Sequence, residues 1–270
     1  MKNIRLALVI QNCSAGQFDV NLQAFETFTL QAKARGADMV VFPEMNLTGY
    51  VSGEKIRDIA RPITQDLEEF LLKLANAQDI IILAGLARKD AVGKIFASHL
   101  SVLPKAGIHI YDKVHTAPPE KEFYSAGDDV SIIHSTHLKF GVQLCYDAHF
   151  PSLSTHMAKQ GAELIVIPHA SPRGDSHEKL ESWLRHLTAR AFDNGIFVAA
   201  CNQVGQNRNG LTFPGVAVVI GPDGRVVDQK LSASEPAMLV TTLKGDLLEQ
   251  VRSHKMRYFL PNRREDLYSC

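Results

Sequence analysis

Three polar residues that could do chemistry each come directly after a short apolar run: Glu44, Cys145 and His169. Short apolar runs flanked by polar or turn residues are typical of buried strands. In open α/β sheets, ligands bind beyond the carboxyl ends of the strands, so we expect these three residues to share one crevice. A further polar segment, residues 111–115, contains Lys113 and closes another expected strand.

Cys145 has two interpretations at such a position. Most free cysteines are small buried apolar residues, but a thiol at a strand end can face a crevice and act as a nucleophile. Because the reference pKa of a thiol is about 8.5, little thiolate exists at neutral pH, and a base or a cation must assist it. The nearest candidates in the sequence are Asp147, His149 and His156. Sequence spacing alone leaves the partner of the thiol open.

Several common catalytic motifs are missing from the sequence. None of the 11 histidines has the H-E-x-x-H spacing of a zinc site. There is also no G-x-S-x-G, Walker A or G-x-G-x-x-G motif. Their absence disfavours serine α/β-hydrolases, P-loop NTPases and Rossmann-type dinucleotide enzymes.

The composition is that of an ordinary globular protein and excludes several kinds of partner. The 270 residues include 29 Lys and Arg against 29 Asp and Glu, so the formal net charge is zero. A neutral balance disfavours nucleic-acid binding and polybasic membrane attachment, because both require excess positive charge. The four cysteines include no C-x-x-C pair and form neither a disulfide framework nor a zinc ribbon. We therefore expect a cytoplasmic protein.

Strand and helix patterns alternate along the chain, which favours an α/β domain. Apolar residues spaced i, i+3, i+4, i+7 predict amphipathic helices around residues 67–74 and 180–187. The Gly-Pro-Asp-Gly turn at residues 221–224 predicts a hairpin, so part of the sheet should be antiparallel. Strands are expected at residues 4–10, 39–42, 80–83, 140–144, 164–167, 196–200, 216–220, 224–227 and 238–242.

One domain is expected to span residues 1–270, because no repeat, low-complexity segment or linker interrupts the pattern. The apolar core at residues 6–10 is too short for a signal peptide, and we interpret it as the first strand. No later stretch approaches the roughly 18 apolar residues needed to cross a bilayer.

Three segments resemble the signature segments of the nitrilase superfamily, the carbon–nitrogen hydrolases. They are VVFPEMNLTGY (40–50), YDKVHTAPPEKEFYSAGDD (111–129) and FGVQLCYDAHFPSL (140–153). They hold the family's catalytic Glu, Lys and Cys in the family's order, as Glu44, Lys113 and Cys145. Later segments, 183–205, 213–227 and 262–268, are similar to the family's long helix, late hairpin and tail, so nearly the whole chain is covered.

The resemblance implies an α/β fold with a four-layer α-β-β-α sandwich and mixed sheets. It also implies a homodimer or larger homo-oligomer, assembled through helices near the nucleophile and through the tail. From about residue 251 the chain carries aromatic residues among many cations. This tail is either a solvated extension or an arm that buries Tyr258, Phe259 and Leu260 on a neighbouring subunit.

The resemblance also implies roles for the three signature residues. Glu44 would take the thiol proton, and Cys145 would attack the substrate carbonyl. Lys113 and the backbone N–H of Tyr146 would stabilise the oxyanion.

A second glutamate often positions substrate or assists proton transfer in this family. The segment PEKEFYSAGD aligns Glu120 with it, and Glu122, two residues on, is the rival. The residues expected to bind substrate are Tyr50, Tyr146, His169 and Ala170, with Trp183 as a weaker candidate.

Two residues after the nucleophile depart from the family pattern. His149 replaces the usual Arg and Ser152 the usual Glu, which puts in doubt the ion pair and the carboxylate binding of those positions. The Cys-Tyr-Asp sequence favours amides over nitriles. We expect an amidase without metal or cofactor that acts on a small aliphatic or ω-amide and binds neither nucleic acid nor membrane. The alternatives are an N-carbamoyl amide hydrolase, a nitrilase, and a catalytically silent binding protein on the same fold.

Overall fold

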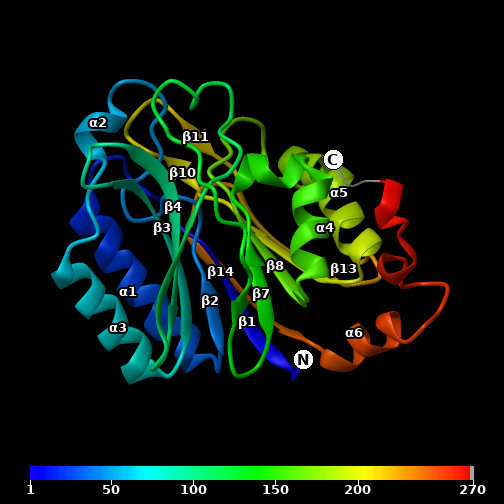
Figure 1. Ribbon diagram of the computed structural model, residues 1–270. Helices are drawn as coiled ribbons and strands as arrows, with labels where there is room; N and C mark the ends of the chain where they lie inside the picture. The colour runs from blue at the N-terminus through cyan, green and yellow to red at the C-terminus, as the bar shows by residue number, and fades with distance from the viewer. Residues whose placement is uncertain (268–270) are drawn as a thin grey trace.

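The structure, a computed structural model, describes residues 1–267, and Tyr268, Ser269 and Cys270 lie outside the described residues. Two six-stranded sheets lie between two layers of helices (Figure 1). Helices α1 (Phe18–Ala34) and α3 (Gln65–Gln78) cover one sheet, and α4 (Pro151–Lys159) and α5 (Ser176–Asn194) cover the other. The architecture is the expected four-layer α-β-β-α sandwich.

The first sheet contains β1 (Ile4–Ile10), β2 (Met39–Val41), β3 (Ile81–Lys89), β4 (Ile95–Leu103), β5 (Gly107–Asp112) and β14 (Ala237–Leu243). Their order across the sheet is β14-β1-β2-β3-β4-β5. The pairs β1–β2 and β2–β3 are parallel, and the others are antiparallel. The sheet is therefore mixed, as expected.

The second sheet contains β6 (Ile133–His134), β7 (Lys139–Val142), β8 (Leu164–Pro168), β9 (Phe197–Cys201), β12 (Gly215–Ile220) and β13 (Val226–Ser232). Their order is β13-β12-β9-β8-β7-β6, with β7, β8 and β9 parallel. The turn at residues 221–224 joins β12 and β13 as an antiparallel hairpin, which confirms that prediction. The smaller elements are α2 (Ile56–Ile59), α6 (Gly245–Arg252), the pair β10 (Gly205–Gln206) and β11 (Thr212–Phe213), and the 3₁₀ turns η1 (Cys145–His149), η2 (Leu260–Asn262) and η3 (Glu265–Leu267).

Strand β1 shows why the apolar runs are nearly continuous. Its alternate residues Leu6 and Leu8 belong to the core that includes the second sheet, whereas Ala7 and Val9 belong to the core under α1 and α3. Successive side chains of a strand point to opposite faces, so a strand covered on both faces is apolar at most positions. The sandwich thus accounts for the pattern seen in the sequence.

Helix α5 has clear start and stop signals. Asp175 accepts hydrogen bonds from the N–H groups of His177 (2.8 Å) and Glu178 (2.9 Å), and Glu178 accepts one from the N–H of Asp175 (3.2 Å). This reciprocal capping box satisfies N–H groups that have no partner within the helix. Gly195 ends the helix with φ +58°, the left-handed conformation that glycine adopts without a steric penalty. The helix is held at both ends and presents a fixed face to the second sheet.

The tail beyond α6 lies beside α4 and α5 of the same chain (Figure 1). The rings of Phe259 and Phe192 are 5.4 Å apart, and Lys159 pairs with Glu265 at 2.8 Å. Phe259 is still 42% exposed, while Tyr258 and Leu260 are partly buried. Packing of this tail on a second subunit stays a prediction.

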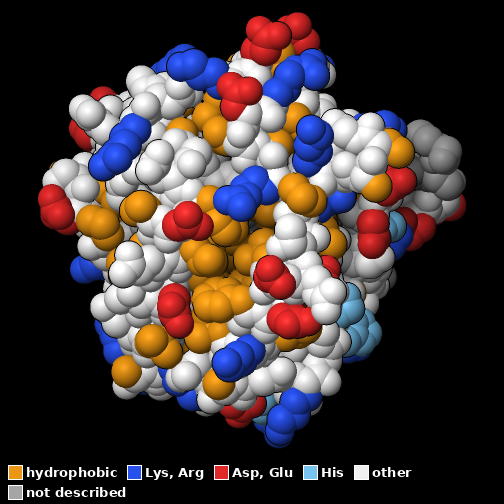
Figure 2. All heavy atoms as spheres, turned by 90° about the vertical axis from the view of Figure 1, so that its left-hand side faces the viewer, with side chains coloured by type: hydrophobic (Ala, Val, Ile, Leu, Met, Phe, Trp, Pro, Cys, Tyr) orange, Lys and Arg blue, Asp and Glu red, His pale blue; other side chains and the backbone are white. Residues whose placement is uncertain are grey.

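The face on the side of α1 and α3 carries apolar side chains near its centre, with charged side chains of both signs around them (Figure 2). This mixture agrees with the zero net charge of the sequence. Within residues 1–267, no helix has the length and apolar character needed to cross a membrane.

Candidate active site

Glu44, Lys113, Cys145 and His169 lie at one edge of the sandwich. Glu44 follows β2 and Lys113 follows β5, both in the first sheet. Two successive antiparallel pairings make β5 run in the same direction as β3, so both residues lie at the same edge. Cys145 and His169 follow β7 and β8 of the second sheet. The four residues thus lie beyond the carboxyl ends of strands.

Glu44, Lys113 and Glu120 form a buried ionic cluster. Each is at most 2% exposed. Lys113 Nζ lies 2.9 Å from Glu44 Oε1 and 3.1 and 3.0 Å from the two oxygens of Glu120. Buried charges are stable only when they are paired and hydrogen-bonded. Glu122 is exposed, so the structure places Glu120 in the cluster and its rival at the surface.

Neighbouring donors hold both carboxylates in place. Tyr50 donates its hydroxyl hydrogen to Glu120 Oε1 (3.0 Å), and the Ala117 N–H donates to Oε2 (2.8 Å). The Ala170 N–H donates to Glu44 Oε2 at 2.9 Å. Each carboxylate oxygen therefore has a donor, which fixes the orientation of both groups relative to Lys113.

The cluster sets the protonation of its members. Burial raises the pKa of Glu44, the positive charge of Lys113 lowers it, and the negative charge of Glu120 raises it again. Together these effects raise the pKa of Glu44 to about 7. Burial alone would lower the pKa of Lys113, but the two glutamates reverse this and raise it above its ordinary value. Glu44 is therefore poised to exchange a proton near neutral pH, while Lys113 remains a cation.

Cys145 is half-buried at the start of η1 and has a strained backbone, with φ +40°. A non-glycine residue in the left-handed region costs about 1–3 kcal/mol and is common at functional sites. Burial raises the pKa of the thiol to about 12, Glu44 contributes to the increase and Lys113 opposes it. The thiol is consequently protonated at neutral pH.

The three titratable groups nearest to Cys145 in the sequence have other surroundings. Asp147 is fully buried and accepts hydrogen bonds from the Leu144 N–H (3.0 Å), the Tyr111 hydroxyl (2.8 Å) and the His115 N–H (2.8 Å). These bonds fix the turn that carries the thiol. His156 is exposed on α4, and the ring of His149 is tilted against that of His186, with 4.5 Å between ring centroids. The carboxylate whose charge acts most strongly on the thiol is Glu44, from the opposite sheet.

A small cavity of about 80 Å³ opens beside the thiol. His169 and Trp183, two of the expected wall residues, line it and stack with 4.0 Å between ring centroids. The other expected residues act differently: Tyr50 and Ala170 hold the carboxylates, and the ring of Tyr146 packs edge-on against Phe150. The cavity is lined by Cys145, His149, His169, Ser171, Lys179, Ser182, Trp183 and His186.

Lys179, Ser182 and His186 were missed in the sequence. With Trp183 they follow an i, i+3, i+4, i+7 spacing, so they share one stripe of α5. This helical spacing is visible in the sequence, but the neighbouring apolar stripe with Leu180 and Leu187 gives the stronger pattern.

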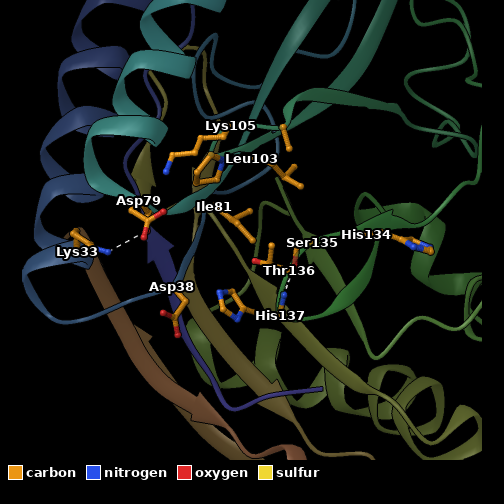
Figure 3. Close-up of a pocket in the computed structure, with 12 residues that line it drawn as sticks. Lys33, Asp38, Asp79, Ile81, Leu103, Lys105, His134, Ser135, Thr136 and His137 are labelled. Atoms are coloured by element: carbon orange, nitrogen blue, oxygen red, sulfur yellow. Dashed lines mark hydrogen bonds between the residues drawn. The ribbon is translucent and has the colours of Figure 1, made fainter.

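A larger cavity, of about 590 Å³, lies at the opposite edge of the sandwich (Figure 3). Three of the residues that line it precede parallel strands rather than follow them: Asp38 comes before β2, Asp79 before β3 and His137 before β7. It contains neither Cys145 nor the ionic cluster, so its volume does not make it the reaction site. In the described part of the chain, no group of three or more His, Cys, Asp or Glu is placed to hold a metal ion.

Comparison with known proteins agrees with this geometry. The family model of the carbon–nitrogen hydrolases matches residues 5–253. The chain belongs to the carbon–nitrogen hydrolase family. This carbon–nitrogen hydrolase is 30% identical to an (R)-stereoselective amidase of a Pseudomonas species, over 72% of this chain and 69% of that protein.

Two further relatives match almost the entire carbon–nitrogen hydrolase chain. A nitrilase of Pyrococcus abyssi is 28% identical over 98% of this chain and 99% of its own. The structure of an amidase of Nesterenkonia sp. AN1 superposes with a TM-score of 0.82 at 24% identity, covering 98% of this chain and 95% of that one. That structure carries the acetamide moiety of fluoroacetamide, added covalently at the active-site cysteine.

Proposed function

We propose that this carbon–nitrogen hydrolase is an amidase that cleaves a small linear amide through a thioester on Cys145, releasing ammonia and a carboxylic acid. One observation carries the proposal: the buried cluster of Glu44, Lys113 and Glu120 acts electrostatically on a half-buried thiol that lines a cavity. A base, a cation and a nucleophile are the three groups that amide hydrolysis requires.

In the acylation step, the Glu44 carboxylate takes the proton of the Cys145 thiol as the sulfur attacks the carbonyl carbon. The carbonyl oxygen becomes an oxyanion, which accepts hydrogen bonds from Lys113 Nζ and the N–H of Tyr146. One such donor contributes roughly a hundred- to a thousand-fold to the rate. The intermediate collapses when Glu44 returns the proton to the departing nitrogen, so ammonia leaves and the thioester remains.

In the deacylation step, Glu44 takes a proton from water, and the resulting hydroxide attacks the thioester carbonyl. The second oxyanion uses the same two donors, Lys113 and Tyr146 N–H. Its collapse expels the Cys145 sulfur, which recovers a proton from Glu44, and the carboxylic acid is released. A pKa of Glu44 near 7 suits a group that must both accept and donate a proton in each cycle.

The comparisons support an amide as substrate. Two of the related proteins are amidases, one with an acetamide moiety on its cysteine. The Cys145-Tyr146-Asp147 segment favours the same branch over nitrilases. The small cavity favours a short acyl chain, because about 80 Å³ is far below the roughly 300–1,000 Å³ of sites for drug-sized ligands.

The test is a panel of short amides, N-carbamoyl compounds and nitriles, assayed by ammonia release with the wild type and Cys145→Ala. The amides should be hydrolysed by the wild type only, and mass spectrometry should find an acyl group on Cys145. Cys201→Ala is the matched control, because Cys201 is buried in β9 and outside the cavity; it should keep the activity. Full activity of Cys145→Ala would overturn the proposal, and carbon dioxide release would instead indicate an N-carbamoyl substrate.

A further inference from the structure

One stripe of α5 forms a polar wall of the cavity that the proposed chemistry does not use. Lys179, Ser182 and His186 line the cavity together with Cys145. The capping box and the glycine stop fix this helix at both ends, so the wall is preorganised. A polar wall beside a nucleophile can select the acyl part of the substrate.

His186 lines this cavity and carries a ring nitrogen that has no hydrogen-bond partner in the described part of the chain. The carbonyl of Ser182, one turn earlier, is a hydrogen-bond partner of the imidazole, whereas the buried Nε2 has no partner among residues 1–267. The ring therefore donates through Nδ1, which leaves a lone pair on Nε2 in the neutral ring. Burial first, and then His149 and Arg190, lower the pKa of His186 to about 4, so the ring is neutral at pH 7.

Lys179 supplies a donor on the same wall. Its Nζ donates to Ser171 Oγ and to the carbonyl oxygen of Pro172, both at 2.9 Å. An ammonium group has three N–H donors, so one remains beyond these two bonds. The residues that line the cavity include no Asp or Glu.

We propose that this wall selects amides whose acyl chain carries a neutral group that donates a hydrogen bond to His186 Nε2 and accepts one from Lys179. A hydroxyl or a second carboxamide does both. A substrate with an alkyl chain leaves the buried Nε2 without a hydrogen-bond donor. A substrate carboxylate places its negative oxygens against the lone pair of Nε2, and a substrate ammonium group is repelled by the charge of Lys179. This inference rests on the proposed amidase function and adds the substrate class.

The experiment compares pairs of amides of nearly equal size. The first pair, 3-hydroxypropanamide and butanamide, differs by a hydroxyl in place of a methyl group. The second pair, malonamide and malonamate, differs by a carboxamide in place of a carboxylate. Ammonia release gives kcat/KM, and we expect the wild type to prefer the first member of each pair at least about tenfold, because a site built to hydrogen-bond its substrate rejects analogues that lack the group.

Two substitutions of His186 separate the hydrogen bond from packing. His186→Leu removes the acceptor, and both preferences should fall to about one. His186→Gln keeps a hydrogen-bonding side chain and should restore part of each preference. His177→Leu is the matched control, because His177 is exposed on the same helix; it should keep the wild-type ratios. The melting temperature of each variant shows whether it is folded.

Four outcomes overturn the inference. They are a wild type that prefers butanamide, a wild type that prefers malonamate, a His186→Leu variant with unchanged ratios, and a His177→Leu variant that loses them. In all four cases the amides are still hydrolysed, so the amidase function stands. If the wild type hydrolyses no amide at all, the proposed function fails and this inference fails with it.

Discussion

The role of Glu120 can be tested by Glu120→Gln, which keeps the shape of the side chain and removes its charge. Burial is the main cause of the raised pKa of Glu44, and the charge of Glu120 adds to it. Without the charge of Glu120, Glu44 still pairs with Lys113, so the pKa of Glu44 should fall below about 7. The acid limb of the kcat/KM profile should therefore move to lower pH.

The same substitution should lower both the stability and the rate. Glu120 accepts hydrogen bonds from Tyr50, Ala117 and Lys113, and it is 2% exposed. Removing one partner of a buried ion pair costs about 3–5 kcal/mol, and we expect the lower end because Lys113 keeps Glu44. A loss of about 3 kcal/mol corresponds to a decrease in Tm of roughly 6–12 °C.

The rate effect has an upper bound set by Lys113. The neutral amide of the Glu120→Gln variant would hold the Lys113 ammonium group less firmly than the carboxylate does. If Lys113 no longer stabilised the oxyanion at all, kcat would fall by the contribution of one oxyanion donor, roughly a hundred- to a thousand-fold. We expect a loss of at least about tenfold, since a displacement of 1 Å at an active site costs about a hundred-fold. Ammonia release from pH 5 to pH 9 measures the rate and the acid limb together.

Glu122→Gln is the matched control, because Glu122 is exposed two residues away. It should leave the rate, the pH profile and Tm as in the wild type. The reasoning is refuted if Glu120→Gln keeps kcat within twofold, if its acid limb moves to higher pH, or if Glu122→Gln has the same effect.

Two further predictions follow from the same geometry. The kcat/KM of the wild type should fall as the pH drops below about 7, because Glu44, the proposed base, becomes protonated. The profile should show no step near 8.5, because the pKa of Cys145 is raised to about 12. A flat profile between pH 5 and pH 9 would contradict this prediction. Gly85→Ala should lower both the free energy of unfolding, by about 1–3 kcal/mol, and kcat/KM, because an added Cβ would lie 2.6 Å from Met45 N, next to Glu44. Urea unfolding would measure the free energy of unfolding, and ammonia release would measure kcat/KM. An unchanged kcat/KM in a destabilised variant would show that the contact at Gly85 does not control the position of Glu44.

The local elements that the sequence predicted are those with strong periodic or turn signals. Strand β1, helix α5 and the hairpin at residues 221–224 all lie where the pattern placed them. Strand β4 was missed, because Ile95–Leu103 carries serines and a histidine that interrupt an apolar run. These polar residues are buried by the packing of the first sheet, which no local pattern records.

Helix α1 was also missed, for a related reason. Its buried residues include Asn21 and Thr29 beside Phe25 and Ala32, so its inner face is not uniformly apolar. The Asn21 amide donates to the backbone oxygens of Ser14 and Leu47, and these long-range bonds offset the cost of its burial. Propensity and periodicity do not include such partners.

The sequence by itself determined the family and the residue types at the strand ends, because ordered motifs and apolar runs are local features of the chain. Glu44, Lys113 and Cys145 could be named in this way. Only the tertiary structure decided between Glu120 and Glu122, because burial and contact with Lys113 depend on how two sheets meet. It likewise showed that the charge of Glu44, from the opposite sheet, acts on the Cys145 thiol. Charge effects on a pKa act through space, and distance along the chain carries no information about them.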